Sequence, residues 1–399
     1  MRRCRKRKRA GEKPSCLPAA GTSSSSFESL NDDVLGEILV RLPSVAALAR
    51  AACACARWRS LASSPAFLRR FRALHPSLLG HFATDHDDES VLPMFHPARS
   101  QFDDGCSDAA VRGGDFHLTH VDANAGWRLH DCRHGRLLFA NERDLLVYDP
   151  LSRRGVSIRR PSWDPDLSTH FTHLLLADRT DSFRVVSVEH YGEDAARGAV
   201  YSSRTGTWRR GRWDERVVNP KRPSECSYYP GMQADGRVYW KNRDTTRLQV
   251  FDAGDMRFSY VRLPDGVHPR SKYAIGEAED GACCLVCLAD APHGAVFKAY
   301  RLRIVGKGSS SEWWSWELDR RVPASLVIGK LKYPPVRHVC AVVAGVVLIC
   351  FQNYSAPHRH VAFRLSDMKV EATLRSSGRA YPYLMPWRHS PTLPSSSLV

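Results

Sequence analysis

The chain has 399 residues, of which 43% are hydrophobic and 25% are charged, and it carries a formal net charge of +16. These values are typical of a globular protein long enough for two or three domains, and they exclude a chain that is disordered throughout. The longest apolar stretch, Val339–Phe351, is interrupted by Gly345 and is shorter than the roughly 18 apolar residues that a membrane-spanning helix requires. The sequence therefore predicts no membrane-spanning segment.

Residues 1–26 form a basic segment with a single acid, Glu12, and without the apolar core of a secretory signal. We therefore expect the protein in the nucleus and/or the cytoplasm, where its 12 cysteines would be small buried residues without disulfides. A dense run of cations is typical of a nuclear-localisation signal, and it also fits a solvated disordered tail. The candidate signal residues are Arg2, Arg3, Arg5, Lys6, Arg7, Lys8 and Arg9.

Residues 27–76 predict a domain of four short helices. Asn31 is a good N-cap for the first helix, which Leu42-Pro43 ends. An alanine-rich second helix follows, a third carries Trp58, and Ser64-Pro65 opens the fourth. A unit this small buries too little of its own surface to be comfortably stable, so we expect it to need a partner.

The order and spacing of residues in this helical segment resemble an F-box. Two positions depart from the usual pattern: Asn31 stands where proline is common, and Ala56 stands where lysine is common. Asn31 can still cap a helix, whereas the missing charge at Ala56 is expected to weaken partner binding slightly. The matching residues are Leu30 to Pro43, Leu48, Cys55, Arg57-Trp58-Arg59 and Pro65-Ala66-Phe67.

The resemblance implies a function. F-boxes dock on a small Skp-family adaptor, which bridges to a cullin scaffold, so the chain is expected to be the substrate-recognition subunit of a Skp–cullin–F-box E3 ubiquitin ligase. Such a subunit is not an enzyme and uses no cofactor or metal, because it acts by holding a protein substrate near the ubiquitin-loaded enzyme. By position, the residues that would face the adaptor or support that face are Leu30, Leu35, Ile38, Leu39, Leu42, Pro43, Leu48 and Trp58.

Beyond residue 76 the helical periodicity gives way to short strand-like segments that repeat. A small or apolar residue followed by an aromatic recurs, with 53, 50, 49 and 63 residues between successive aromatics. Most copies follow a glycine and another strand, and turn residues come after several of them. Counting back 53 residues from the first aromatic places a degenerate copy at Phe95. The recurring aromatics are Tyr148, Tyr201, Phe251, Tyr300 and Phe363.

A period near fifty residues is close to that of a four-stranded propeller blade. The fold class expected is multidomain, α followed by all-β: a basic tail at 1–26, a helical F-box at 27–76, a six-bladed β-propeller at 77–390 and a disordered tail at 391–399. Five or seven blades stay open, and a pair of β-sandwiches is the alternative. An F-box followed by such repeats resembles the large plant F-box family with an associated C-terminal β-propeller, and His75–Phe82 is similar to the junction in that family.

Metal and catalytic motifs are not convincing in the repeat region. Cys284 and Cys287 form a C-x-x-C pair, but strand alternation places them on opposite faces, whereas zinc needs convergent thiolates. Two histidine pairs have no acidic or cysteine partner at a useful spacing, and we interpret them as satisfied surface histidines. These pairs are His170 with His173 and His358 with His360.

One stretch of the repeat region is both basic and aromatic, which suits an acidic or phosphorylated peptide. The alternative, aromatic blade core beside solvated arginines, is favoured. A nuclear nucleic-acid-binding protein is the runner-up function, with nucleic acid otherwise not expected as a partner. An adaptor-binding protein outside any ligase is a third. The candidate substrate-binding residues are Arg209, Arg210, Arg212, Trp213, Lys221 and Arg222.

Overall fold

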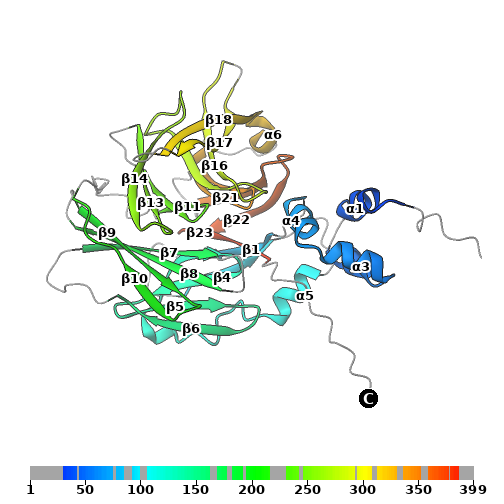
Figure 1. Ribbon diagram of the computed structural model, residues 1–399, viewed down its shortest axis with the longest axis horizontal. Coiled ribbons are helices and arrows are strands. Elements are labelled where there is room, and N and C mark those ends of the chain that lie inside the picture. Colours follow the sequence, from blue (N-terminus) through cyan, green and yellow to red (C-terminus); the bar gives the residue numbers. More distant parts are fainter. Residues whose placement is uncertain are drawn as a thin grey trace, which may run out of the picture.

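A computed structural model gives the arrangement of the chain, with four helices beside a body of strands (Figure 1). The tails expected at 1–26 and 391–399, including the seven candidate nuclear-localisation residues, lie outside the described residues. The described residues are 30–42, 45–74, 78–84, 92–98, 106–161, 169–177, 182–191, 195–215, 231–241, 246–292, 294–307, 312–329, 336–351, 358–376 and 378–385.

Within these residues, no helix has both the length and the apolar character needed to cross a membrane.

The four expected helices are present, and side-chain caps explain where three of them begin. The Asn31 side chain accepts a hydrogen bond of 2.8 Å from the Asp33 N–H, and the Ser64 hydroxyl accepts one of 3.2 Å from the Phe67 N–H. Cys55 is exposed rather than buried, because its sulfur caps the third helix. The helices are α1 (Asp32–Val40), α2 (Val45–Ala52), α3 (Ala56–Ser63) and α4 (Pro65–Leu74).

The helical domain has its own small core and is braced by ion pairs between helices. Arg57 of α3 contacts Asp32 of α1 at 2.7 Å, and Arg70 of α4 pairs with Glu37 of α1. Solvent screens pairs this exposed, so they add little stability and apolar burial carries most of it. The buried residues are Leu35, Leu39, Val40, Leu48, Ala62 and Phe71.

The strands form six separate antiparallel sheets, which confirms a six-bladed β-propeller and excludes a pair of β-sandwiches. We number the sheets as blades in chain order. Blade 1 holds β1 (Leu78–Ala83), β2 (Met94–Pro97) and β23 (Ala380–Leu384); blade 2 holds β3 (Arg128–Arg133), β4 (Arg136–Ala140), β5 (Asp144–Asp149) and β6 (Arg154–Arg159); blade 3 holds β7 (Thr169–Ala177), β8 (Phe183–Tyr191), β9 (Ala195–Ser202) and β10 (Thr207–Arg210).

In blades 4, 5 and 6, as in blades 2 and 3, each strand pairs with the next strand along the chain. Blade 4 holds β11 (Met232–Ala234), β12 (Arg237–Trp240), β13 (Arg247–Asp252) and β14 (Arg257–Arg262); blade 5 holds β15 (Lys272–Glu277), β16 (Cys283–Ala289), β17 (Val296–Lys307) and β18 (Glu312–Pro323); blade 6 holds β19 (Val336–Val343), β20 (Val346–Phe351), β21 (His358–Arg364) and β22 (Val370–Ser376).

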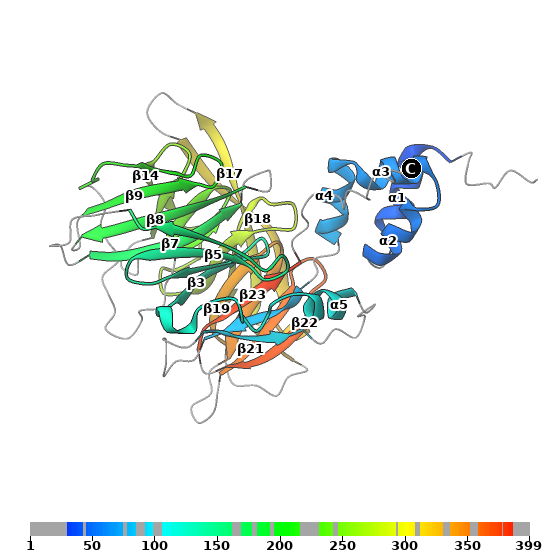
Figure 2. The same cartoon turned by 90° about the horizontal axis from the view of Figure 1, so that it is seen from below.

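Blade 1 joins the two ends of the propeller. β1 pairs with β23 in antiparallel register, with Phe82 opposite Tyr381, and with β2, where Phe82 lies opposite Phe95. β23 also reaches the neighbouring blade, because the Tyr383 hydroxyl donates to the Gly135 carbonyl at 3.1 Å. Strands from opposite ends of the domain therefore complete one sheet and close the ring, and they lie side by side in both ribbon views (Figures 1 and 2).

The repeating aromatic predicted from the sequence marks the third strand of every blade. Phe95 lies on β2, which is the third strand of blade 1 when the strands are counted from β23. The degenerate first copy is therefore confirmed. No fourth strand of blade 1 occurs among the described residues. The others are Tyr148 on β5, Tyr201 on β9, Phe251 on β13, Tyr300 on β17 and Phe363 on β21.

The glycines that precede second strands are required by tight turns. His134 and Gly135 both have positive φ, 50° and 72°, as do Ala344 and Gly345, 47° and 79°. Two consecutive residues in this conformation fit a two-residue hairpin turn whose twist matches that of the flanking strands. The repeated glycine therefore sets the hairpin between the first and second strands.

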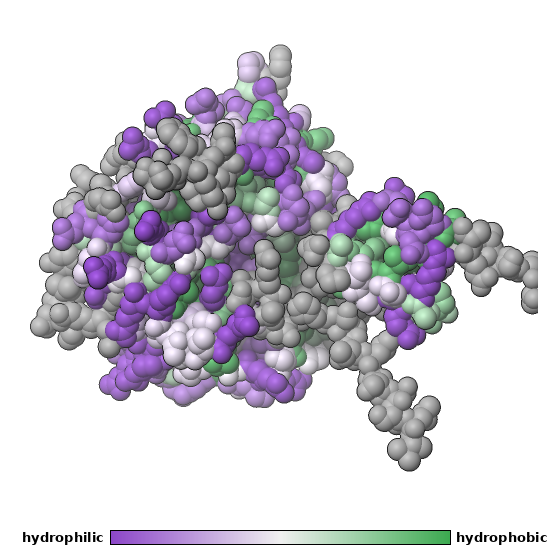
Figure 3. All heavy atoms as spheres, viewed as in Figure 1, coloured by the Kyte–Doolittle hydropathy of each residue, from purple (hydrophilic) through white to green (hydrophobic). Residues whose placement is uncertain are grey.

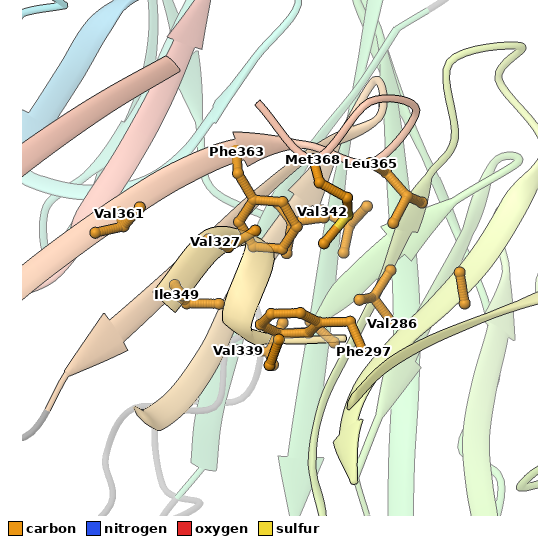
Figure 4. Close-up of a cluster of buried hydrophobic side chains, with 14 of the residues drawn as sticks. Val286, Phe297, Val327, Val339, Val342, Ile349, Val361, Phe363, Leu365 and Met368 are labelled. Atoms are coloured by element: carbon orange, nitrogen blue, oxygen red, sulfur yellow. The ribbon is translucent and has the colours of Figure 1, made fainter. Parts of the chain in front are cut away.

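Adjacent blades share cores. Between blades 5 and 6, the rings of Phe297 and Phe363 lie with centroids 5.0 Å apart, surrounded by buried aliphatic side chains (Figure 4). Cys284 faces this cluster, whereas Cys287 faces the cluster shared with blade 4, so the expected placement of the two thiols on opposite faces is confirmed.

The segment between blades 1 and 2 is helical in part, which the sequence analysis did not predict. This segment holds α5 (Cys106–Gly113) and a 3-10 turn (Ala123–Ala125). Elsewhere in the chain, a short helix, α6 (Ser325–Ile328), follows β18 of blade 5. The Asp115 carboxylate organises the loop, since it accepts a hydrogen bond of 2.6 Å from the Tyr148 hydroxyl and one of 2.9 Å from the Thr119 N–H. Phe116 then packs against Phe82 of blade 1, with ring centroids 6.2 Å apart.

Replacing Gly276 with alanine should destabilise the propeller. A Cβ at Gly276 on β15 would lie 1.9 Å from the Val342 carbonyl oxygen on β19, and a backbone cannot rotate away as a side chain can. We expect the free energy of unfolding to fall by about 2–3 kcal/mol, measured by urea unfolding of the full chain. The matched control is Gly113→Ala, where a Cβ meets open space; an equal effect in both variants would contradict close blade packing at Gly276.

Candidate functional site

An exposed apolar row lies on α1. Val34 and Ile38, one helical turn apart, are 47% and 39% exposed although both are large hydrophobic residues. Leu30 and Leu42, which flank the helix, are half-buried. Apolar residues are visible at the surface of the helical domain, which lies to one side of the propeller (Figure 3). This row is therefore available to a partner.

The other predicted docking residues lie in a second layer beneath this row. Leu35, Leu39 and Leu48 are at most 5% exposed and form the core of the helical domain. Trp58 is half-buried and packs against that core, while Pro43 lies outside the described residues. Sequence reasoning left Val34 out of the docking residues, although the four-residue spacing between Val34 and Ile38 was available as a signal.

Charged groups border the exposed row. Glu37 lies between the two apolar residues in sequence, and its hydrogen bond from Arg70, with Arg41 nearby, lowers the pKa of its carboxyl. Arg57 holds Asp32 and also donates to the Leu30 carbonyl at the start of the helix. Acidic and basic side chains thus border the row on α1.

Two residues of the basic and aromatic stretch of blade 3 make contacts within the propeller. The Arg209 guanidinium donates to the carbonyls of Ala253 and Gly254 in blade 4 at 2.8 and 2.7 Å. Trp213 lies beneath the guanidinium of Arg197, 4.3 Å from its ring centroid. For Arg209 and Trp213, these contacts support a structural role in the blades rather than substrate binding.

Two further candidates of this stretch lie at the surface. Arg210 and Arg212 are exposed, at and beyond the end of β10, the strand of blade 3 farthest from the ring centre. Lys221 and Arg222 lie outside the described residues. Among the described residues, the exposed basic candidates of this stretch are therefore Arg209, Arg210 and Arg212.

A cavity of about 210 Å³ lies where the first strands of the blades meet. Residues of β3, β7, β11, β15, β19 and β23 line it, together with the basic side chains of Lys241, Arg337 and Arg379. Such a concave, mixed polar and apolar surface at the centre of the ring is suited to binding a ligand.

Asp131 on β3 joins three blades at this cavity. Its buried carboxylate accepts hydrogen bonds from the Leu175 N–H on β7 at 2.8 Å, from the Gln233 side-chain amide on β11 at 2.5 Å, and from the Cys132 N–H at 2.9 Å. A buried carboxylate with three donors holds neighbouring first strands at fixed spacing. No local sequence pattern predicts this role of Asp131, because two of the donors lie 44 and 102 residues away.

The interpretation of the histidine pairs as surface residues is wrong for two of them. His173 and His360 are only 2% and 3% exposed, because both faces of β7 and β21 are covered at these positions, where residues 173–176 and 360–363 are all buried. His173 is satisfied by a hydrogen bond of 2.7 Å to the Ser187 hydroxyl. His360 lies opposite Cys350 across the β20–β21 pair, which is the cysteine partner that sequence spacing did not reveal.

Family comparisons agree with both parts of the structure. A family model of the F-box domain matches residues 27–70, which covers α1 to α3 and most of α4. A family model described as "F-box protein AT5G49610-like, beta-propeller" matches residues 128–317, from β3 into β18. The chain is an F-box protein with a β-propeller domain. The family resemblance inferred from the sequence, of an F-box joined to a propeller, is thereby confirmed. The matched region of this F-box protein holds blades 2 to 4 and most of blade 5.

Solved structures resemble this F-box protein only distantly. TolB from Acinetobacter baumannii is 10% identical, with a TM-score of 0.35 over 71% of this chain and 62% of that one. A chain of the fission yeast SREBP–SCAP binding-domain complex is 9% identical, with a TM-score of 0.31 over 58% and 59%. A chain of the mitotic checkpoint complex is 11% identical, with a TM-score of 0.32 over 62% and 63%. The F-box protein spans less than two thirds of each of these chains, and no curated protein matches it.

Asp131→Asn should weaken the centre of the propeller. The amide would present an N–H toward one of the three donors that now share the carboxylate, leaving a buried donor unsatisfied. The expected loss is about 1–3 kcal/mol in the free energy of unfolding, measured by urea denaturation. Asp235→Asn is the control, because Asp235 lies in an exposed turn with positive φ that asparagine tolerates; equal losses would rule out a special role for Asp131.

Proposed function

We propose that this F-box protein is the substrate-recognition subunit of a Skp–cullin–F-box E3 ubiquitin ligase. In this proposal the helical domain binds a Skp-family adaptor and, through it, a cullin scaffold, while the propeller binds a protein substrate for ubiquitination. The observation that carries the proposal is the exposed row of Val34 and Ile38 on a helical domain that already has its own core.

The energetics favour a partner on this row. Fully burying a valine or isoleucine side chain stabilises by roughly 1.5–3 kcal/mol, and these two are about half exposed, so an adaptor would gain about 1 kcal/mol from each. Leu30 and Leu42 extend the apolar area at both ends. The framing ions Asp32, Glu37 and Arg41 supply the polar rim that protein interfaces usually have.

The proposed mechanism involves no bond chemistry by the chain itself. A substrate held on the propeller would meet the ubiquitin-loaded enzyme at a raised effective concentration, which is how a tethered partner gains rate without a new contact. Six blades that share cores form a rigid platform for such tethering. The basic residues at 2–9 lead us to propose the nucleus as one site of action, together with the cytoplasm.

Aspartate at Val34 and Ile38 should abolish adaptor binding without unfolding the chain. The double variant Val34→Asp, Ile38→Asp removes two apolar contacts and places two charges in the interface, so we expect at least a ~100-fold loss of affinity, or about 3 kcal/mol. The measurement is co-expression of the full chain with a Skp-family adaptor, followed by size exclusion and calorimetric titration of the purified components.

Two control variants separate docking from folding. Leu318→Asp changes a propeller residue that is 51% exposed and should leave adaptor binding unchanged. Leu39→Asp places a charge in the helical core and should unfold that domain, seen as loss of helical circular dichroism. Full binding by the Val34/Ile38 variant would reject this face as the docking site.

A second candidate function rests on the net charge of +16. A nucleic-acid-binding protein would show an affinity that falls steeply with salt. If the wild-type chain is folded but does not bind the adaptor, titration with double-stranded DNA at two salt concentrations distinguishes this candidate.

A further inference from the structure

Blade 6 brings two thiols and an imidazole together. Cys340 on β19, Cys350 on β20 and His360 on β21 come from three adjacent strands, and their ligand atoms all lie within 4.8 Å of one another. Four-coordinate zinc with sulfur and nitrogen ligands has these atoms about 3.5–3.8 Å apart. The cluster is therefore within about 1 Å of the spacing that zinc requires.

A break in strand register places Cys340 in this cluster. Val339 pairs with Ile349 and Ala341 with Leu348, so Cys340 is an extra residue of β19 between two regular pairs. A bulge of this kind can turn a side chain toward a site, whereas regular strand alternation would point that side chain to the opposite face. Cys350 and His360 need no such break, since they lie directly opposite each other.

The burial of the cluster and its place beside the cavity also fit a bound ion. Cys350 and His360 are 4% and 3% exposed, and Cys340 is half-buried. The Nδ1 atom of His360 is buried and has no hydrogen-bond partner among the described residues. All three residues line the central cavity, so a fourth coordination position would open into it.

The charges around the cluster allow a cation only when the thiols ionise. Lys241, Arg337 and Arg379 line the same cavity and oppose a cation, together with His338 and His358 if these are protonated. Zinc binds cysteine as the thiolate, so zinc binding would release the protons of Cys340 and Cys350 to solvent and place two negative charges beside the ion.

We propose that Cys340, Cys350 and His360 form a zinc site whose fourth coordination position faces the central cavity of the propeller. Two thiolates and a neutral imidazole are ligands that zinc prefers, and three protein ligands with one open position distinguish this site from a closed structural centre. The ion would hold three strands of blade 6 together. The basic side chains around the cavity would favour an anionic fourth ligand.

Cobalt serves as the probe, because tetrahedral Co²⁺ bound by thiolates absorbs strongly in the visible and near ultraviolet. The full-length chain is stripped with a chelator under reducing conditions and titrated with Co²⁺, then with Zn²⁺. We expect one Co²⁺ per chain, a thiolate charge-transfer band and its loss on adding Zn²⁺. Cys340→Ser, Cys350→Ser and His360→Gln should each weaken binding by more than about 100-fold, beyond the usual effect of losing a supporting hydrogen bond.

Cys132→Ser is the matched control and should bind Co²⁺ like the wild type. Cys132 lines the same cavity, but its thiol donates to the Pro382 carbonyl and is not in the cluster. Absence of a stoichiometric thiolate band, or a band that survives Cys350→Ser, overturns the proposal. So does a Cys340–Cys350 disulfide in the native chain, which would make the pair a redox element.

A measurement on the wild-type chain tests the zinc proposal even if the variants do not fold. Zn²⁺ should slow the alkylation of Cys340 and Cys350 by iodoacetamide at least tenfold, measured by peptide mass spectrometry, and leave that of the exposed Cys53 and Cys55 unchanged. Equal alkylation rates with and without Zn²⁺ overturn the proposal.

Discussion

The pairing of β1 with β23 is the constraint on which the propeller depends. Each blade shares its core with its neighbours, so an open ring would expose the apolar faces of the first and last blades. The chain closes the ring by completing blade 1 with strands from both ends of the domain, in a register that places Phe82 opposite both Tyr381 and Phe95. Closure converts weak pairings between blades into one cooperative unit.

Closure also creates the centre of the molecule. Once the ring is complete, first strands that are far apart in the sequence meet around a cavity, where Asp131 can bind donors of two other blades. The same geometry turns Cys340, Cys350 and His360 toward that space. Polar side chains of several blades therefore meet at the centre of the propeller, whereas Arg209 of β10 contributes to a contact between blades 3 and 4.

The helical domain divides its apolar residues between two layers. Leu35, Leu39 and Leu48 hold the helices together, and Val34 and Ile38 stay exposed. The sequence pattern placed the helices and most of this apolar set correctly, because caps and helical spacing are local. It could not separate the two layers, since the angle at which α3 and α4 pack on α1 decides which face is covered.

Local and periodic features were determined by the sequence alone. The capping residues defined the helices, and the recurring aromatic and glycine defined the blades, since a strand and a tight turn depend on neighbouring residues. The tertiary structure decided the rest: the closure by β23, the joining role of Asp131, and the burial of His360 beside Cys350. These features join residues that are distant in the chain, and their contacts depend on strand register and blade angle, which no local pattern encodes.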